Sequence, residues 1–86
     1  MNFEFDPMKS AMNKVKHGID FEEAQFLWDG KTVWLPLSYP AETRHLVLGM
    51  IGKRHWSAIV TKRKNSVRII SVRRSRREER KLYEQS

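Results

Sequence analysis

The N-terminal part of the chain begins with an alternating pattern and continues with a helical spacing of apolar residues. Phe3 and Phe5 flank Glu4, which predicts a short strand. Asp6 and Pro7 predict a helix start, because Asp is a preferred N-cap and Pro is favoured at the first helical position. The apolar residues that follow are spaced i, i+3, i+4 and i+7, which predicts the apolar face of an amphipathic helix. These residues are Met8, Ala11, Met12 and Val15.

Two short signals predict where this helix ends and a second one begins. Gly18 can adopt the left-handed conformation that ends a helix. Asp20 and Glu23 have the spacing of a capping box, which predicts a second, shorter helix starting at Asp20. Asp29 and Gly30 form a turn pair that ends it. Its apolar face consists of Phe21, Ala24, Leu27 and Trp28.

The middle of the chain predicts a hairpin. Residues 44–51 and 55–61 are rich in apolar and β-branched residues, and the pair 52–53 is a candidate two-residue turn. With that turn, the numbers of paired residues sum to 105, so Leu48 is expected opposite Ser57.

The other elements complete a small α+β fold. They are an edge or irregular strand over 32–37, a loop over 38–42, a strand over 67–72 and a helix over 76–84. Ser75 is expected to cap the last helix, with Glu78 at the third helical position. The predicted order is β-α-α-β-β-β-β-α in one domain over residues 1–86. We expect a mainly antiparallel sheet of about four strands, with two N-terminal helices and one C-terminal helix.

Charge divides the chain sharply. Its net charge of +7 comes entirely from residues 62–86, where ten Lys and Arg face three Glu. The absence of cysteine excludes disulfide-linked domains, Cys-ligated zinc sites and thiol catalysis. No apolar run approaches the roughly 20 residues that span a bilayer, and no signal-peptide pattern is present, so a cytoplasmic protein without membrane contact is expected.

The basic segment 68–81 crosses from a predicted strand into a predicted helix, and it is the strongest candidate for function. Several guanidinium groups beside a helix N-terminus are suited to bind phosphate. The alternative is a solvated helix face, but the like charges of Arg76 and Arg80 at i,i+4 would then only repel each other. We therefore expect a polyanionic or acidic partner.

Other candidate residues each have a structural alternative. His17 either caps its helix or acts as an acid or base. Tyr83 either clamps its helix to the sheet, with a hydrogen bond to Glu79, or takes part in catalysis. Glu79 could also hold an arginine in position. The tryptophans either pack in the core or stack on bases. The spacing of the three histidines predicts no metal site, and no cofactor motif is present.

The two ends of the chain together resemble BrnT toxins, the toxic partners of BrnA in bacterial type II toxin–antitoxin pairs. The opening motif comprises Phe5-Asp6-Pro7, Lys9, Asn13, Lys16-His17-Gly18-Ile19 and Phe21-Glu22-Glu23-Ala24. The closing motif comprises Arg68-Ile69-Ile70-Ser71-Val72-Arg73-Arg74, Glu79-Arg80 and Tyr83. The resemblance implies a RelE-like fold and an endoribonuclease that inhibits translation. It also implies neutralisation by a dimeric, DNA-binding BrnA-type antitoxin, through which the pair contacts its operator DNA.

The resemblance marks Arg68, Arg73, Arg74, Glu79 and Arg80 in the closing motif, and Lys16 and His17 in the opening one. From these and other basic residues we expect a site for metal-independent RNA cleavage. Arg68 and Arg73 are expected to stabilise the transition state, and His17 or Glu79 is the expected base. The expected RNA-binding residues are Lys62, Arg63, Arg74, Arg77 and Arg80. Two other functions stay open from the sequence: a non-catalytic nucleic-acid-binding domain, and a protein-interaction module with a basic face.

Overall fold

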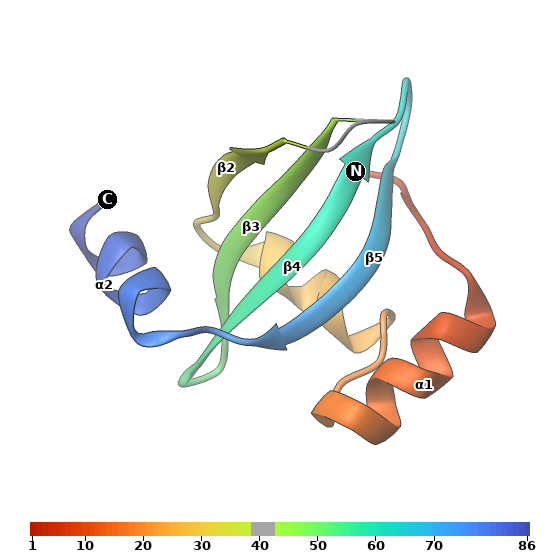
Figure 1. The fold of residues 1–86 in the computed structure, drawn as a ribbon, viewed down its shortest axis with the longest axis horizontal. Coiled ribbons are helices and arrows are strands. Elements are labelled where there is room, and N and C mark those ends of the chain that lie inside the picture. Colours follow the sequence, from red (N-terminus) through yellow and green to blue (C-terminus); the bar gives the residue numbers. More distant parts are fainter. Residues whose placement is uncertain (39–42) are drawn as a thin grey trace.

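The computed structural model describes residues 1–38 and 43–86, and its central element is a five-stranded mixed sheet (Figure 1). The strands follow the order β1-β5-β4-β3-β2 across the sheet. They are β1 (Phe3–Glu4), β2 (Val33–Leu37), β3 (Arg44–Ile51), β4 (Arg54–Lys62) and β5 (Val67–Arg74). The α+β class and the element order are confirmed. The expected sheet of about four mainly antiparallel strands is corrected, because β1 adds a fifth strand, parallel to β5.

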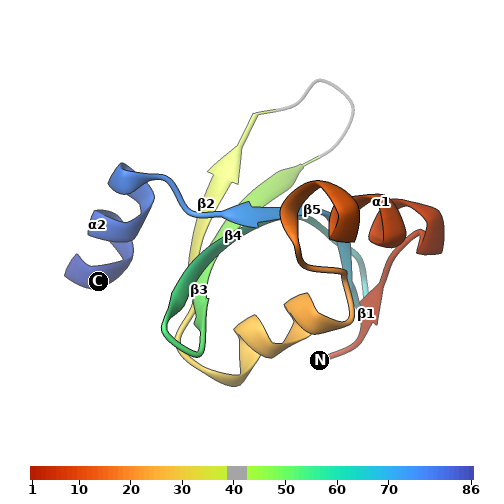
Figure 2. The same ribbon diagram turned by 90° about the horizontal axis from the view of Figure 1, so that it is seen from below.

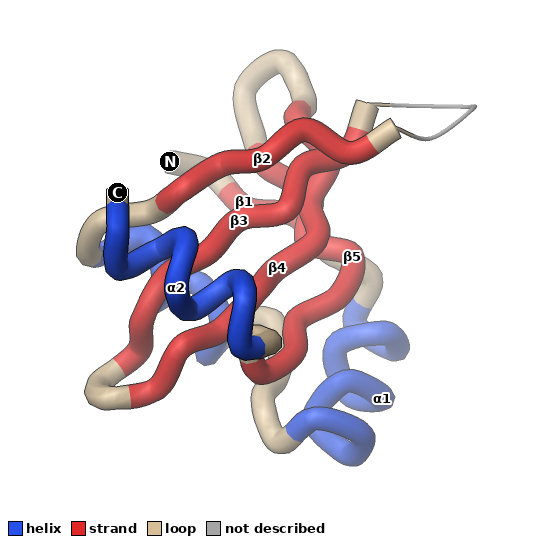
Figure 3. Tube along the Cα trace, turned by 60° about the vertical axis from the view of Figure 1, so that its left-hand side comes forward, coloured by secondary structure: helices blue, strands red, loops and turns tan. Residues whose placement is uncertain are grey.

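In the described part of the chain, three helices surround the sheet. The 3₁₀ helix η1 (Glu23–Asp29) lies on one face and α2 (Arg77–Gln85) on the other, as Figures 2 and 3 show. The first helix, α1 (Pro7–His17), lies beside the outer edge of β5. The face under η1 is therefore the core side, and the face under α2 is only partly covered.

The caps predicted for the first helix are confirmed. The side chain of Asp6 accepts a hydrogen bond from the Met8 N–H at 2.8 Å, and Gly18 ends α1 at φ 80°. Asp20 and Glu23 exchange the expected reciprocal hydrogen bonds, at 2.8 and 3.0 Å. The predicted helix start at Asp20 is wrong, because the second helix is a 3₁₀ helix that begins at Glu23 after the N-cap residue Glu22. These short-range signals depend only on neighbouring residues, which is why the sequence reveals them.

The predicted hairpin is also confirmed, with Leu48 opposite Ser57. Gly52 supplies the positive φ of 61° that the turn requires. The loop predicted over 38–42 lies almost wholly outside the described residues, which omit 39–42.

The core lies between the sheet and η1. It contains two residues that precede η1, two residues of η1 and the inward-facing residues of the three long strands: Ile19, Phe21, Ala24, Leu27, Val47, Trp56, Ala58, Val60, Val67, Ile69 and Val72. Gly49 allows η1 to approach β3 closely, because a Cβ at this position would lie 2.6 Å from Leu27 Cδ2. The tryptophans contribute to this packing, with Trp28 and Trp34 placed against the cluster.

The apolar face predicted for α1 does not pack into the core. Met8, Met12 and Val15 are exposed, whereas the polar residues Ser10 and Asn13 are buried. Ser10 Oγ accepts a hydrogen bond from the Phe21 N–H at 2.8 Å. The helix is thus attached to the protein by buried hydrogen bonds rather than by apolar packing.

Asn13 makes the largest contribution to this attachment. Its side-chain amide donates to the carbonyls of Ile19 and Val72, at 2.8 and 2.9 Å. Its Oδ1 accepts from the Val72 N–H at 3.2 Å. The Asn13 side chain therefore pairs with the edge of β5 as a neighbouring strand would.

The start of the last helix differs from the prediction by one residue. Arg76 is the N-cap, so Glu79 and not Glu78 is the third helical residue, and Glu79 Oε1 accepts from the Arg76 N–H at 2.8 Å. Ser75 does not cap α2, because its hydroxyl pairs with that of Ser57 at 2.8 Å. Within the part of the chain that is described, no helix is long and apolar enough to cross a membrane.

Candidate active site on the open face of the sheet

A β-bulge in β5 decides which arginines lie together. Ser71 is opposite Ile59, whereas Ile69 is opposite the next residue of β4, so Ile70 is the extra residue. In a regular strand, residues five apart point to opposite faces. The bulge instead places Arg68 and Arg73 on the same face, the one that α2 partly covers.

This open face has three successive rows of side chains. Arg44, Thr61 and Arg68 form one row across β3, β4 and β5. The middle row consists of Leu46, Ile59 and Ser71, and the next contains Leu48, Ser57 and Arg73. Because two rows correspond to four residues of β4, the backbones at Arg68 and Arg73 are separated by about 13 Å along the strand. A partly exposed apolar strip thus lies between two cationic positions.

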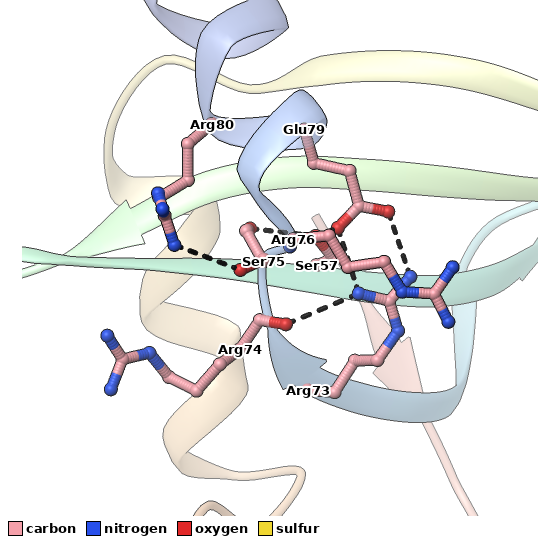
Figure 4. Close-up of polar contacts among 7 residues, drawn as sticks. All are labelled: Ser57, Arg73, Arg74, Ser75, Arg76, Glu79 and Arg80. Atoms are coloured by element: carbon pink, nitrogen blue, oxygen red, sulfur yellow. Dashed lines mark hydrogen bonds and ion pairs between the residues drawn. The ribbon is translucent and has the colours of Figure 1, made fainter.

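Arg73 is held by a two-pronged ion pair with Glu79 (Figure 4). Nη1 donates to Glu79 Oε1 and Nη2 donates to Oε2, both at 2.8 Å. Nη1 also donates to the carbonyl of Arg74 at 3.2 Å. Such forked arginine–carboxylate contacts fix the orientation of the guanidinium plane. The side chains of Arg73 and Glu79 are only 22% and 13% exposed.

Glu79 connects the sheet to the start of α2. Besides Arg73, it accepts hydrogen bonds from Ser57 Oγ at 2.9 Å and from the Arg76 N–H at 2.8 Å. The hydrogen bonds from Arg73 are the main reason that the pKa of Glu79 falls from 4.5 to about 2, and those from Arg76 and Ser57 lower it further. The same contact raises the pKa of Arg73. Both groups are therefore charged at neutral pH.

Arg68 is held less tightly than Arg73. Its Nη1 lies 3.5 Å from Glu4 Oε1, and Arg63 Nε lies 3.5 Å from the same oxygen. Ser66 Oγ donates to the other carboxylate oxygen of Glu4 at 3.1 Å. Arg63 and Arg68 are 47% and 36% exposed, so their guanidinium groups are accessible to a ligand.

The other predicted residues lie away from this pair. Lys62 lies over the Trp34 ring at 5.6 Å, on the core side of the sheet. Arg74 lies over the Trp56 ring at 5.5 Å and points away from Arg73 (Figure 4). Arg80 donates to the Ser75 carbonyl at 3.4 Å, and Arg77 is exposed at the first turn of α2. The structure thus brings Arg73 together with Glu79, and Arg68 together with Arg63.

The two remaining candidates have distinct surroundings. His17 lines a groove between α1 and β5, beside Ile70 and Ser71. The Tyr83 hydroxyl donates to the Lys31 carbonyl at 2.9 Å, so the predicted hydrogen bond to Glu79 is wrong. Its ring packs edge-on against that of His55, and Tyr83 therefore clamps α2 to the sheet.

Sequence reasoning missed three residues of the open face: Arg44, Ser57 and Glu4. Arg44 could have been found, because the sum rule of the hairpin places it opposite Thr61. Ser57 has no local signal, since its role depends on the position of α2. Glu4 reaches Arg68 only because β1 pairs with β5, across more than 60 residues of chain.

A sheet face with fixed and accessible guanidinium groups, beside partly exposed apolar side chains, is typical of a protein that acts on a phosphate-containing polymer. Comparison with known proteins identifies the family within this class. Residues 5–79 match the family described as the ribonuclease toxin BrnT of type II toxin–antitoxin systems, and the chain belongs to this family. No curated protein matches the chain.

Family membership confirms the resemblance seen in the sequence. The protein is a ribonuclease, the toxin of a type II toxin–antitoxin system, with RNA as its substrate and an antitoxin as its partner.

Proposed function

We propose that this toxin cleaves RNA without a metal ion, by attack of a ribose 2′-OH on the adjacent phosphate, with Arg73 as the main catalytic cation. The new O–P bond forms as the bond to the 5′ oxygen breaks, which leaves a 2′,3′-cyclic phosphate and a free 5′-OH. The 2′-OH gives its proton to a base, and the 5′ oxygen takes one from an acid. The observation that carries this proposal is the forked Arg73–Glu79 pair on the open face.

The free edge of Arg73 is suited to a phosphate. A guanidinium has five N–H groups, and Arg73 uses two on Nη1 and one on Nη2 for Glu79 and the Arg74 carbonyl. Among the described residues, none accepts from its Nε–H or its second Nη2–H. These two donors form one edge of the plane and can bind two phosphate oxygens together. Donors fixed in advance stabilise the charge that develops in the transition state.

Glu79 is proposed as a positioning residue and His17 as the base. With a pKa of about 2 and both oxygens bound to Arg73, Glu79 is a poor proton acceptor at neutral pH. His17 lies in the groove that also contains Ser71, two residues before Arg73 on β5. Imidazole is the side chain used most often for proton transfer at neutral pH.

The RNA backbone is proposed to cross the rows of the open face. Arg68 and Arg63 would bind a phosphate near Glu4, and the strip of Leu46 and Ile59 would contact a base. The exposed basic residues Lys62, Arg74, Arg77 and Arg80 would add attraction at the rim, which depends on salt.

Incubation of the purified toxin with RNA in excess EDTA tests metal-independent cleavage. We expect 2′,3′-cyclic phosphate ends, identified by mass spectrometry of a short defined oligonucleotide. Loss of cleavage in EDTA, with recovery on adding Mg²⁺, would contradict the mechanism.

The partner is proposed to be a BrnA-type antitoxin, a DNA-binding dimer that covers the open face and brings the toxin to operator DNA. The positive charge of residues 62–86 would then be masked in the complex. A gel-shift assay with operator DNA tests this: the antitoxin alone and the complex should bind, and the toxin alone should show no operator preference. An antitoxin that suppresses cleavage but does not bind DNA would contradict this part of the proposal.

A further inference from the structure

Helix α1 has an apolar stripe with no partner among the described residues. Met8, Met12 and Val15 are 76%, 68% and 90% exposed. Their spacing of four and three residues places them on one side of the helix, along about 10 Å of its length. Three large apolar side chains aligned in this way are unlike the isolated apolar residues common on protein surfaces, and they indicate an interaction site.

The stripe borders a groove between α1 and the outer edge of β5, with a volume of about 530 Å³. Its apolar lining includes Met12, Val15 and Ile70, the extra residue of the bulge. On this edge, β5 pairs with β1 only at Val67 and Arg68. We call the stripe and the groove together the α1 surface.

The charges around the α1 surface have one sign. Lys9 and Lys16 line the groove, and α1 contains no acidic residue. A second copy of α1 would therefore place like charges together, which is unfavourable. RNA phosphates would pair with Lys9 and Lys16 but would leave the apolar side chains of Met12 and Val15 uncovered. A partner that fits has apolar side chains flanked by carboxylates.

We infer that the α1 surface is the primary docking site for the antitoxin, and that its occupant is an amphipathic helix with a stripe of apolar residues flanked by Asp and Glu. This inference rests on the proposed function, which requires a neutralising partner. About 10 Å of apolar stripe matches two turns of such a helix. Methionine side chains adapt readily to the shape of a partner.

Docking at the α1 surface would also place part of the antitoxin on the open face. The groove extends to Ser71, which lies in the middle row between Arg68 and Arg73. A chain that leaves the α1 surface at Ser71 therefore passes directly onto the proposed RNA path. The α1 surface supplies the affinity, and the adjoining segment blocks the substrate.

The test measures binding and cleavage separately. The probe is the antitoxin protein encoded by the gene beside the toxin gene, titrated into the toxin by calorimetry. Met12→Glu and Val15→Glu should each weaken binding at least about tenfold, because they remove apolar contact and place a negative charge against the acidic flanks. Met12→Leu should bind within about twofold of wild type.

The matched control is Phe26→Glu, which changes a large apolar side chain on η1 that is 60% exposed and lies outside the α1 surface. Its antitoxin binding should equal that of wild type. Without antitoxin, all four variants should keep the far-ultraviolet circular dichroism spectrum of the wild type, which shows that they are folded. Wild-type affinity in both Met12→Glu and Val15→Glu would overturn the inference. So would a toxin dimer that dissociates when Met12 is changed.

The two proposals fail in different ways. If the wild-type toxin cleaves no RNA in EDTA but the α1 variants still bind antitoxin weakly, the mechanism is wrong and the docking site stands. If wild-type cleavage is intact and Met12→Glu impairs it at full antitoxin affinity, the α1 surface belongs to the RNA path and the docking site is wrong.

Discussion

Glu79→Gln removes the charge that orients Arg73 while keeping the size of the side chain. In the wild type, both Glu79 oxygens accept hydrogen bonds from the guanidinium at 2.8 Å. A Gln amide offers one acceptor and places a donor against the second guanidinium nitrogen. We therefore expect Arg73 to lose its fixed orientation, the start of α2 to loosen, and RNA cleavage to fall.

The size of the effect on stability follows from the pKa of Glu79. A decrease from 4.5 to about 2 corresponds to an upper limit of about 3 kcal/mol in the free energy of unfolding. Both side chains stay partly exposed, at 13% and 22%, so water weakens the ion pair. We therefore expect Glu79→Gln to lower the free energy of unfolding by about 2 kcal/mol at pH 7. For a chain of this length, this lowers the melting temperature by about 10 °C.

Urea unfolding followed by circular dichroism at several pH values measures this contribution. A carboxyl group whose pKa is lowered by folding stabilises the protein above its unfolded pKa and loses that contribution as it is protonated. The stability difference between wild type and Glu79→Gln should thus be complete above about pH 5 and decrease towards pH 2.

The matched control is Glu78→Gln, one residue earlier in the same helical turn and exposed. It removes the same charge without touching Arg73, so its stability should differ from that of wild type by less than about 0.5 kcal/mol. If Glu79→Gln is as stable as Glu78→Gln, or if its deficit stays constant down to pH 2, the reasoning about the ion pair is refuted.

Three further substitutions test the fold that positions the site. Asn13→Ala should cost about 2–3 kcal/mol in urea unfolding, because it leaves buried backbone groups of Ile19 and β5 without partners. Gly49→Ala should cost about 1–3 kcal/mol, since the new Cβ would meet Leu27 at 2.6 Å. Tyr83→Phe should cost about 1 kcal/mol and increase amide exchange in α2, because the hydrogen bond to the Lys31 carbonyl is lost.

Each of these predictions has a result that would contradict it. A fully stable Asn13→Ala would show that α1 is not attached through the edge of β5. Gly30→Ala is the control for Gly49, because a Cβ there meets nothing within 4 Å, and equal effects of the two would contradict the close approach of η1. Unchanged amide exchange in Tyr83→Phe would show that Tyr83 is not the clamp of α2.

The sequence predicts the parts of the fold that depend on neighbouring residues. Asp6 and Gly18 bound α1, and the Gly52 turn fixes the register of β3 and β4, because caps and tight turns have local chemical requirements. The fifth strand could not be predicted in this way. Its two residues pair with β5, more than 60 residues away in the sequence, and no local pattern indicates that pairing.

The orientation of α1 could not be predicted from periodicity. The apolar spacing of its residues is a true helical pattern, but it marks a surface and not the core. Burial of Ser10 and Asn13 is favourable because their side chains form hydrogen bonds with backbone groups of other segments. The local sequence pattern does not indicate these hydrogen bonds.

The candidate site was partly predictable for a related reason. Arg68, Arg73 and Glu79 stand out by charge and by the family resemblance, yet plain alternation along β5 would separate the two arginines onto opposite faces. The bulge at Ile70 places both arginines on the open face. Because α2 begins one residue later than predicted, Glu79 lies at its third position and reaches Arg73.

The central claim is that Arg73, oriented by Glu79, stabilises the transition state of RNA cleavage. It is tested most directly by single-turnover cleavage of a defined RNA in EDTA by Arg73→Ala, with Arg54→Ala, an exposed arginine at the start of β4, as the control. The account predicts a loss of about 100-fold or more for Arg73→Ala at saturating enzyme, and an unchanged rate for Arg54→Ala. A folded Arg73→Ala protein that cleaves RNA at the wild-type rate would contradict it.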